Sequence, residues 1–271
     1  MKSTSRFFEF ALLVAVSAVL GHASSCVGNC GTDTANGDVT NPPGFSSYNY
    51  VSTFQGKDQG GLLPAVFGPP GVITTDGSTF TTGSFTATAG EQINFEFNYV
   101  TSDGTTTFPD YAWAALMSTT GGANYLIFSA QTQPSPINTV PGKTMPALSP
   151  GASLTPSTSP ITPGSGATTG PVWAELGGSS GDCYGGPGQG CGLTGWITSN
   201  FNGEAADTYV LKFGVSNASD QALDTGLAFA GVEVGGVPVG GSVPEPSSIV
   251  LMGSALTALA VVLRRRHRAN L

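Results

Sequence analysis

The chain has 271 residues and an acidic balance, with nine basic against 17 acidic residues. Residues 24–242 alone carry 15 acidic and three basic side chains, a formal net charge of −12. Because such a surface repels phosphate backbones, the composition argues against nucleic acid as a partner, whereas divalent cations and neutral or cationic polymers remain open. Glycine is about twice as common as usual, and with Thr-, Val- and aromatic-rich runs it favours an all-β fold.

Residues 1–23 are typical of a secretory signal peptide. Lys2 and Arg6 precede an apolar core at residues 11–20, and small residues near Ala23 provide a cleavage site. We therefore expect signal peptidase to cleave after Ala23 and the protein to be exported across the inner membrane.

Four cysteines fall in two close pairs, Cys26 with Cys30 and Cys183 with Cys191. In an oxidising compartment each pair is expected to form a disulfide within one short loop, although four cysteines allow three connectivities. Lipoprotein processing at Cys26 is an alternative, but Ala23 stands where such a site normally has Leu. The second pair lies among glycines without a histidine, so a metal site is not favoured.

Alternating patterns divide residues 24–242 into short strands. In the clearest, residues 92–99, the side chains of Ile93, Phe95, Phe97 and Tyr99 share one face and polar side chains the other. Eight further runs separated by turn residues have strand-like composition: 47–54, 79–89, 111–118, 124–130, 171–176, 194–198, 208–216 and 226–234. Nine strands without a helix predict one extracellular domain, an antiparallel β-sandwich of jelly-roll type.

Nine prolines lie between residues 131 and 171, among Ser, Thr and Gly. Because proline cannot donate to a sheet ladder, we expect this stretch to build neither sheet nor packed core. It is interpreted as an exposed excursion within the sandwich, either a tolerated insertion or an O-glycosylated spacer.

The catalytic residues of common hydrolases are largely missing. The two histidines are His22 in the leader and His267 in the tail, so a nucleophile in the ectodomain would lack its usual base. Residues 177–181 match G-x-S-x-G, but that motif needs a histidine and a strand-to-helix turn. We expect no catalytic residue and no enzyme activity. The alternative is a hydrolase with paired carboxylates, drawn from Glu91, Glu96, Glu175, Glu204 and Glu233, of which no spacing singles out two.

Calcium and glycans are the remaining ligand candidates. Asp103 and Asp110 bracket one inter-strand loop and Asp220 and Asp224 another, and Ca²⁺ binds carboxylates of flexible loops. Aspartate is also a common turn residue and no EF-hand spacing is present, so no metal or other cofactor is assigned. Glycans would stack on exposed tryptophans, although buried ones are commoner. The candidates are Trp113, Trp173 and Trp196.

Residues 243–271 combine three parts in a fixed order. Val243, Pro244, Glu245 and Pro246 precede an uncharged run at residues 249–263, and four arginines follow it: Arg264, Arg265, Arg266 and Arg268. The run is short, because a bilayer core requires about 20 helical residues. By the positive-inside rule the arginines stay in the cytoplasm and the ectodomain lies outside. A simple C-terminal membrane anchor would explain the helix and the arginines.

The order of these parts resembles the PEP-CTERM sorting signal, whose carriers are substrates of exosortases. Residues 243–246 match the motif as it usually stands, and the helix and basic end occupy the expected places. The resemblance implies that the tail holds the chain at the membrane until exosortase removes it, as in other cleaved-tail signals. Pro244 and Pro246 keep the motif extended for presentation to the enzyme.

The ectodomain also resembles the extracellular β-domains that commonly precede such tails, through residues 79–90, 110–116 and 227–232. This resemblance brings no catalytic motif. It implies a non-enzymatic protein of the cell surface or extracellular matrix, structural or glycan-associated in an exopolysaccharide-rich biofilm. Its expected partners are signal peptidase, exosortase, the membrane and extracellular polysaccharide.

Overall fold

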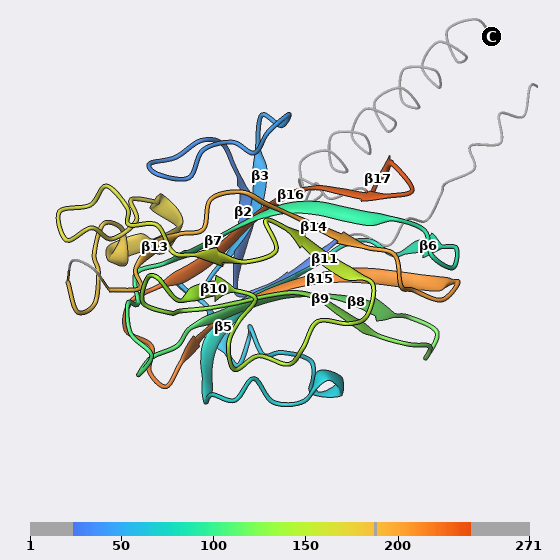
Figure 1. Ribbon diagram of the computed structural model, residues 1–271, viewed down its shortest axis with the longest axis horizontal. Coiled ribbons are helices and arrows are strands. Elements are labelled where there is room, and N and C mark those ends of the chain that lie inside the picture. The colour runs from blue at the N-terminus through green and yellow to red at the C-terminus, as the bar shows by residue number, and fades with distance from the viewer. Residues whose placement is uncertain (1–23, 187–188, 240–271) are drawn as a thin grey trace, which may run out of the picture.

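The computed structural model describes residues 24–186 and 189–239. The expected signal peptide, the sorting motif and the C-terminal helix lie outside these residues. Within them the chain forms two antiparallel sheets that face each other, a separate two-stranded ribbon and two short 3-10 helices (Figure 1). The β-sandwich predicted from the sequence is confirmed.

The first sheet has seven strands, with the main path β1-β5-β15-β8-β9, while β4 pairs with β5 and β6 with β15. Its strands are β1 (Ser25–Val27), β4 (Lys57–Asp58), β5 (Thr74–Thr81), β6 (Phe85–Ala87), β8 (Tyr111–Ser118), β9 (Tyr125–Gln131) and β15 (Asp207–Ala218). We call it the seven-stranded sheet.

The second sheet has eight strands, with the main path β11-β14-β7-β16-β3-β2, while β13 pairs with β7 and β17 with β16. Its strands are β2 (Asn29–Asp33), β3 (Tyr48–Ser52), β7 (Ile93–Thr101), β11 (Ala152–Thr155), β13 (Gly192–Leu193), β14 (Ile197–Phe201), β16 (Thr225–Val234) and β17 (Val237–Pro238). The remaining elements are the ribbon of β10 (Asn138–Val140) and β12 (Ser159–Pro160), and the helices η1 (Ala65–Phe67) and η2 (Ala174–Ser179).

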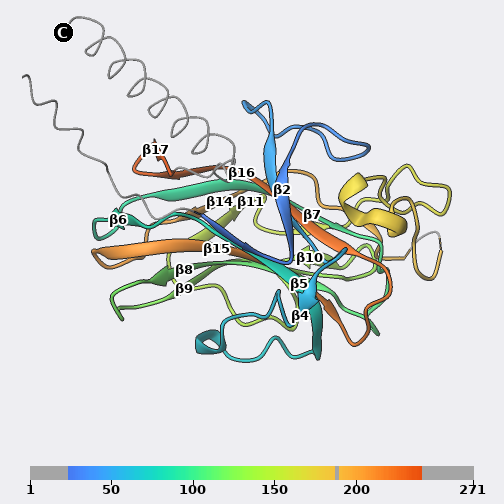
Figure 2. The ribbon, with the colours of Figure 1, turned by 180° about the vertical axis from the view of Figure 1, so that it is seen from behind.

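Eight of these strands follow the order of a jelly roll. In chain order they are β3, β5, β7, β8, β9, β14, β15 and β16, and they form the runs β3-β16-β7-β14 and β5-β15-β8-β9. The first and last strands of the roll are therefore neighbours, as two interleaved Greek keys require. Figure 2 shows the same two layers from behind.

Aromatic side chains fill the space between the sheets. The predicted apolar face of β7 is buried, with Ile93, Phe95, Phe97 and Tyr99 each at most 1% exposed. Across the interface the Phe213 and Phe229 rings stack with centroids 3.8 Å apart and planes at 12°. Because each fully buried side chain of this size contributes about 2 to 3 kcal/mol, such pairs make the main contact between the layers.

Each sheet is also covered on part of its outer face. Over the seven-stranded sheet, the Trp113 indole donates from Nε1 to the Gly61 carbonyl at 2.8 Å, which brings the loop at residues 59–72 down onto β8. Beneath the indole, Gly214 is required, because a Cβ there would lie 2.3 Å from the ring. A second cluster around Trp173 covers the eight-stranded sheet. Strands buried on both faces lose the alternation of a half-buried strand.

Three predicted strands differ from the structure. The run at 79–89 belongs to two strands, because β5 ends at Thr81 and β6 begins at Phe85, and both pair with β15. The strand predicted at 171–176 is wrong, since the 3-10 helix η2 begins at Ala174. This helix includes Gly177 and Gly178, and consecutive glycines do not favour a strand. The run at 194–198 begins later, at Ile197, because Gly195 has φ +70°.

The stretch at residues 131–171 is also better ordered than its prolines predict. β11 pairs with β14 and extends the eight-stranded sheet, and Leu154 from it joins the main core. Val140 and Ile161 are buried in the same core. The expectation that this stretch builds neither sheet nor core is therefore wrong. Edge strands and two-residue bridges tolerate proline because only one side of the strand needs amide donors.

Both predicted disulfides are present, Cys26–Cys30 and Cys183–Cys191. The first joins β1, at an edge of the seven-stranded sheet, to β2, at an edge of the eight-stranded sheet. Gly28 makes the turn between them with φ +83°. This bridge therefore fastens the two layers together along one side of the sandwich.

We expect removal of the first bridge to weaken the whole domain. Replacing both Cys26 and Cys30 with Ala should lower the free energy of unfolding by about 2 kcal/mol, because the bridge reduces the conformational entropy of the unfolded chain. Urea unfolding of the exported protein measures this, with non-reducing peptide mapping to establish the pairing. An unchanged unfolding midpoint, or free thiols in the unaltered protein, would contradict the prediction.

Candidate functional site

The two aspartate-bearing loops singled out in the sequence meet at one end of the sandwich. β7 and β15 both end there and β8 and β16 both begin there, so residues 102–110 and 219–224 are neighbours. Asp110 is 1% exposed. One of its carboxylate oxygens accepts the Ala218 N–H at 2.8 Å and the other accepts the Thr225 hydroxyl at 2.6 Å. Asp110 therefore ties the two loops together from inside the fold.

A second aspartate at this end, Asp103, is buried, and no cationic side chain of the described residues is among the charges that act on it. Burial raises the pKa of Asp103 to about 7; the negative charge of Asp220 adds to the rise, and the backbone N–H groups of Thr105 and Gly104 oppose it. Burial, followed by the charge of Asp103, holds the pKa of Asp110 well above its usual range. The charges acting on both groups are negative. Burial of the charged carboxylates, increased by repulsion between them, therefore costs free energy at this end of the domain, and protonation relieves that cost.

The remaining two acids of these loops accept hydrogen bonds from the protein, and Asp220 accepts the Ala222 N–H at 3.1 Å. Asp224 accepts the Thr53 hydroxyl at 3.1 Å and the Ser179 hydroxyl at 2.8 Å. Within residues 24–186 and 189–239, no three His, Cys, Asp or Glu side chains converge as metal ligands. The loops that suggested calcium thus come together, but their carboxylates point to separate hydrogen-bond donors.

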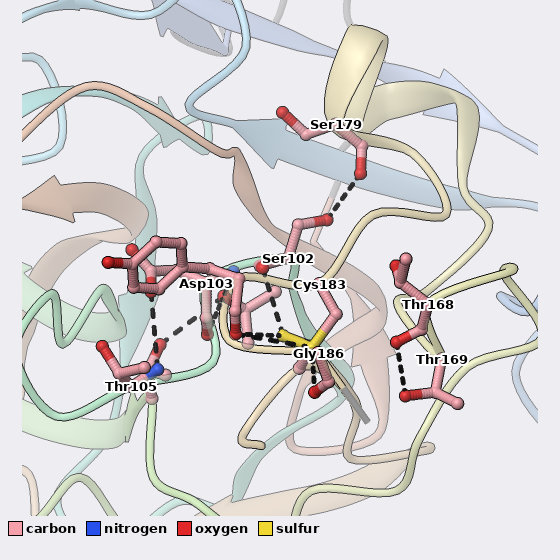
Figure 3. Close-up of a disulfide and its surroundings, with 12 residues drawn as sticks. Ser102, Asp103, Thr105, Thr168, Thr169, Ser179, Cys183 and Gly186 are labelled. Carbon is pink, nitrogen blue, oxygen red and sulfur yellow. Dashed lines mark hydrogen bonds between the residues drawn. A yellow bond between two sulfur atoms is a disulfide. The ribbon is translucent and has the colours of Figure 1, made fainter. Parts of the chain in front are cut away.

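The second disulfide holds a further loop against the same end. The Tyr184 N–H donates to the Ser102 carbonyl at 3.0 Å, and the Ser102 hydroxyl donates to the Ser179 carbonyl at 2.8 Å. Figure 3 shows the sulfur bridge at Cys183 lying against the segment that carries Ser102 and Asp103. The bridge therefore closes a loop that packs over the buried aspartates.

The G-x-S-x-G match lies in this layer and is structural. Ser179 stands in the helix η2 and donates to Asp224, while the Ser180 hydroxyl accepts the Trp173 N–H at 3.0 Å. The part of the chain that the structure describes contains no histidine, because both histidines fall in the undescribed termini. Neither serine is placed beside a base of the kind that activates a hydroxyl nucleophile.

The three tryptophans are mainly structural. Trp113 and Trp173 are at most 1% exposed, and the Trp173 Nε1 donates to the Tyr48 hydroxyl at 3.0 Å. Trp196 is half-buried, and its Nε1 donates to the Thr40 carbonyl at 2.9 Å. Only Trp196 retains an accessible surface on which a ligand could stack.

The five glutamates do not meet at one point. Glu96 accepts the Thr198 hydroxyl, Glu91 accepts the Thr88 N–H and hydroxyl, and Glu233 accepts the Asn94 amide. Glu204 is 3% exposed, and among the described residues its carboxylate oxygens have no hydrogen-bond partner of good geometry, although the backbone N–H groups of Glu204 and Glu91 lie near enough to lower its pKa. Burial raises the pKa of Glu204, and the charge of Glu91 adds to the rise.

One close pair of carboxylates involves a residue that the sequence did not indicate. Asp33, at the end of β2, lies near Glu175 of η2, and the Tyr50 hydroxyl hydrogen-bonds to Glu175. Burial is the main cause that raises the pKa of Glu175, and the charge of Asp33 contributes. The two residues are 142 positions apart in the chain, so no local pattern could have paired them.

A polar row on the outer face of the eight-stranded sheet was also missed. In register across β11, β14, β7 and β16 lie Ser153, Asn200, Asn94 and Glu233. Of the four strands in this row, only the one at residues 92–99 could be predicted from the sequence, because its polar and apolar residues alternate. The partners on the other strands depend on the sheet order, which the sequence does not state.

The comparisons with known proteins identify the tail. Residues 242–266 match the PEP-CTERM protein-sorting motif. Neither the curated proteins nor the solved structures contain a match to the chain. The chain thus carries the sorting motif of exosortase substrates on a β-rich domain. The motif implies export, membrane anchoring by the C-terminus before sorting, and processing by exosortase.

The membrane-spanning helix expected in this tail is not tested by the structure. Among the described residues, none of the helices has the length and apolar character needed to span a bilayer. The sorting residues 243–246 and the four arginines lie outside the described ranges.

We predict that the mature protein lacks both ends of the chain. The leader should end at Ala23, and the tail should be cut near residues 244–246. Intact-mass measurement of the protein from its native host checks both cuts. A mature form that retains Arg264 to Arg268 would leave the tail as an ordinary anchor.

We also predict that the domain becomes more stable as the pH falls from 8 to 5. Asp103 has a pKa of about 7 in the folded protein, above the ordinary value near 3.8, so folding favours its protonated form. This contribution is fully present below the ordinary value and is lost as the pH rises through about 7. Asp103→Asn should remove on the order of 2 kcal/mol of this dependence between pH 5 and 8.

The measurement is the free energy of urea unfolding across this pH range. Asp58→Asn is the matched control, because it removes one negative charge from an exposed position on β4. If the free energy of unfolding depended equally on pH in the Asp103→Asn variant and in the unaltered protein, Asp103 would not be the source of the pH dependence.

Proposed function

We propose that this protein is a non-enzymatic component of the cell surface or extracellular matrix, sorted by exosortase and associated with extracellular polysaccharide. The observation that carries the proposal is the sorting motif at residues 242–266 on a compact two-layered β-domain. Signal peptidase would remove the leader first. Exosortase would then release the domain from its temporary membrane anchor.

The placement of the carboxylates supports a structural rather than a catalytic role. Asp110 and Asp224 are engaged by loop donors that hold the fold, and Glu96 is engaged by a neighbouring strand. A general acid and a nucleophile or base need to face one bond of a substrate across a short gap. Most acids of this domain instead face hydroxyl or amide groups of the protein.

The charge and chemistry of the surface support polysaccharide as the ligand class. The described domain has three lysines, Lys57, Lys143 and Lys212, so it offers little attraction to polyanions. Its polar sheet face presents amides and hydroxyls, which hydrogen-bond to uncharged sugars. Trp196, the residue before β14, adds a half-buried ring beside Tyr48.

A carboxylate-dependent hydrolase is the second candidate, favoured by the pair Asp33 and Glu175. Burial and the neighbouring Asp33 raise the pKa of Glu175, as is required of a general acid. The aromatic rings of Tyr50 and Trp173 pack edge to face beside the pair. These features would suit a site that binds and cleaves a sugar. They are equally expected of two carboxylates whose only role is to hold η2 against the sheet.

We predict that the pure mature protein binds polysaccharide from its host without cleaving it. A pull-down with that polysaccharide and a set of neutral glycans measures binding, and reducing-end release measures cleavage. Single Glu→Gln changes at positions 91, 96, 175, 204 and 233 should abolish no hydrolysis. Turnover that is lost in Glu175→Gln but kept in Glu233→Gln would establish the hydrolase instead.

A further inference from the structure

A polar hollow lies at the β11–β14 edge of the eight-stranded sheet. Its volume is about 270 Å³. The lining residues come from the segments just before β7 and β11, from β11 and β14 themselves and from the loop after β14: Gln92, Gly151, Ser153, Asn200, Phe201 and Asn202. None of these side chains carries a charge.

Two glycines determine the wall of this hollow. Gly151 has φ +95°, and a Cβ at this position would lie 2.8 Å from the Cα of Gly203. A Cβ on Gly203 would in turn lie 2.4 Å from the Pro150 carbonyl oxygen. The loops before β11 and after β14 therefore meet backbone to backbone, and no side chain from this contact fills the space.

One hydrogen bond orients two of the side chains around the hollow, but several of their hydrogen-bond donors and acceptors are not used. The Gln92 Nε2 donates to the Asn200 Oδ1 at 3.1 Å, which orients both amides. The Gln92 Oε1 and the Asn200 Nδ2 then have no partner among the described residues. The amide of Asn202 and the hydroxyl of Ser153 also form no hydrogen bond with the described protein. The hollow thus offers donors and acceptors side by side.

The uncharged donors and acceptors that line the hollow favour one class of ligand. A divalent cation requires carboxylate oxygens and a phosphate or uronate requires cationic groups, and the lining has neither. A sugar hydroxyl both donates and accepts, as the amides and the serine do. Resting on the proposed association with polysaccharide, we propose that this hollow is a binding subsite for an uncharged, hydroxyl-rich glycan.

The uncharged part of the polar row extends the subsite across the sheet. Asn200 neighbours Asn94 in register, and the Asn94 Nδ2 donates to the Glu233 Oε2 at 3.4 Å, so the charged end of the row is already engaged. Three strands about 4.8 Å apart make an uncharged track of about 10 Å from Ser153 to Asn94. The hollow and the track together fit a short stretch of an oligosaccharide better than a single sugar.

The test measures glycan binding by the mature exported protein and by variants of the hollow. The probes are the purified extracellular polysaccharide of the host, dextran and mannan as uncharged polymers, and alginate as an acidic one. Asn200→Ala and Gln92→Ala should each weaken binding about tenfold, because each removes a hydrogen-bonding group and frees its partner amide. The matched control is Gln221→Ala, which alters an exposed glutamine at the opposite end of the sandwich.

Asn202→Ala keeps the test decisive if the strand variants are unstable. Asn202 is exposed in a turn and makes no hydrogen bond with the described protein, so its loss should weaken binding without changing the thermal midpoint. Binding by the unaltered protein that none of these variants weakens would overturn the subsite and leave the proposed function standing. Preference for alginate would overturn the uncharged class of ligand. Failure of the unaltered protein to bind any probe would overturn the proposed function and the subsite with it.

Discussion

The scarcity of cations governs how this domain is held together. Residues 24–242 contain 15 carboxylates and three lysines, so acids cannot be satisfied mainly by ion pairs. The carboxylates that organise loops accept N–H and O–H groups instead. Asp38 accepts the Ser165 and Val172 amides at 2.8 Å each, and so joins two loops more than 120 residues apart. Charged acceptors make stronger hydrogen bonds than neutral ones, which makes each such contact worth more than an exposed salt bridge.

Hydrogen bonds do not compensate fully for the burial of carboxylates at the end of the sandwich where residues 102–110 and 219–224 meet. Asp38 is partly accessible; burial alone would raise its pKa, but the N–H groups of Ser165 and Val172 and the Ser165 hydroxyl together outweigh burial and lower the pKa. Asp103 is deeper and has negative neighbours, so burial prevails and its pKa rises. The same type of side chain therefore stabilises one loop layer at neutral pH and opposes folding in another. The disulfide between Cys183 and Cys191 closes a loop over the second group.

Sequence patterns predicted the layers but not what covers them. The alternation at Ile93 to Tyr99 indicated one wall of the core because β-strand side chains follow a period of two, and β7 confirms it. Cysteine spacing indicated both disulfides because each pair is local. The ordering of residues 131–171 could not be inferred, because β11 depends on a partner strand 45 residues downstream. The Asp33 and Glu175 pair and the hollow at Gln92 and Asn200 have the same origin, since each joins segments that only the jelly-roll order brings together.

The position of the tail links sorting to the polar face. Val239 is the last described residue, and β17 pairs with the part of β16 that carries Glu233. Four residues lie between Val239 and Pro244, and the five residue steps from one to the other can span at most about 17 Å even when fully extended. Cleavage near Pro244 would therefore leave only a few residues after β17, so the released protein would consist of little more than the sandwich that carries the polar row.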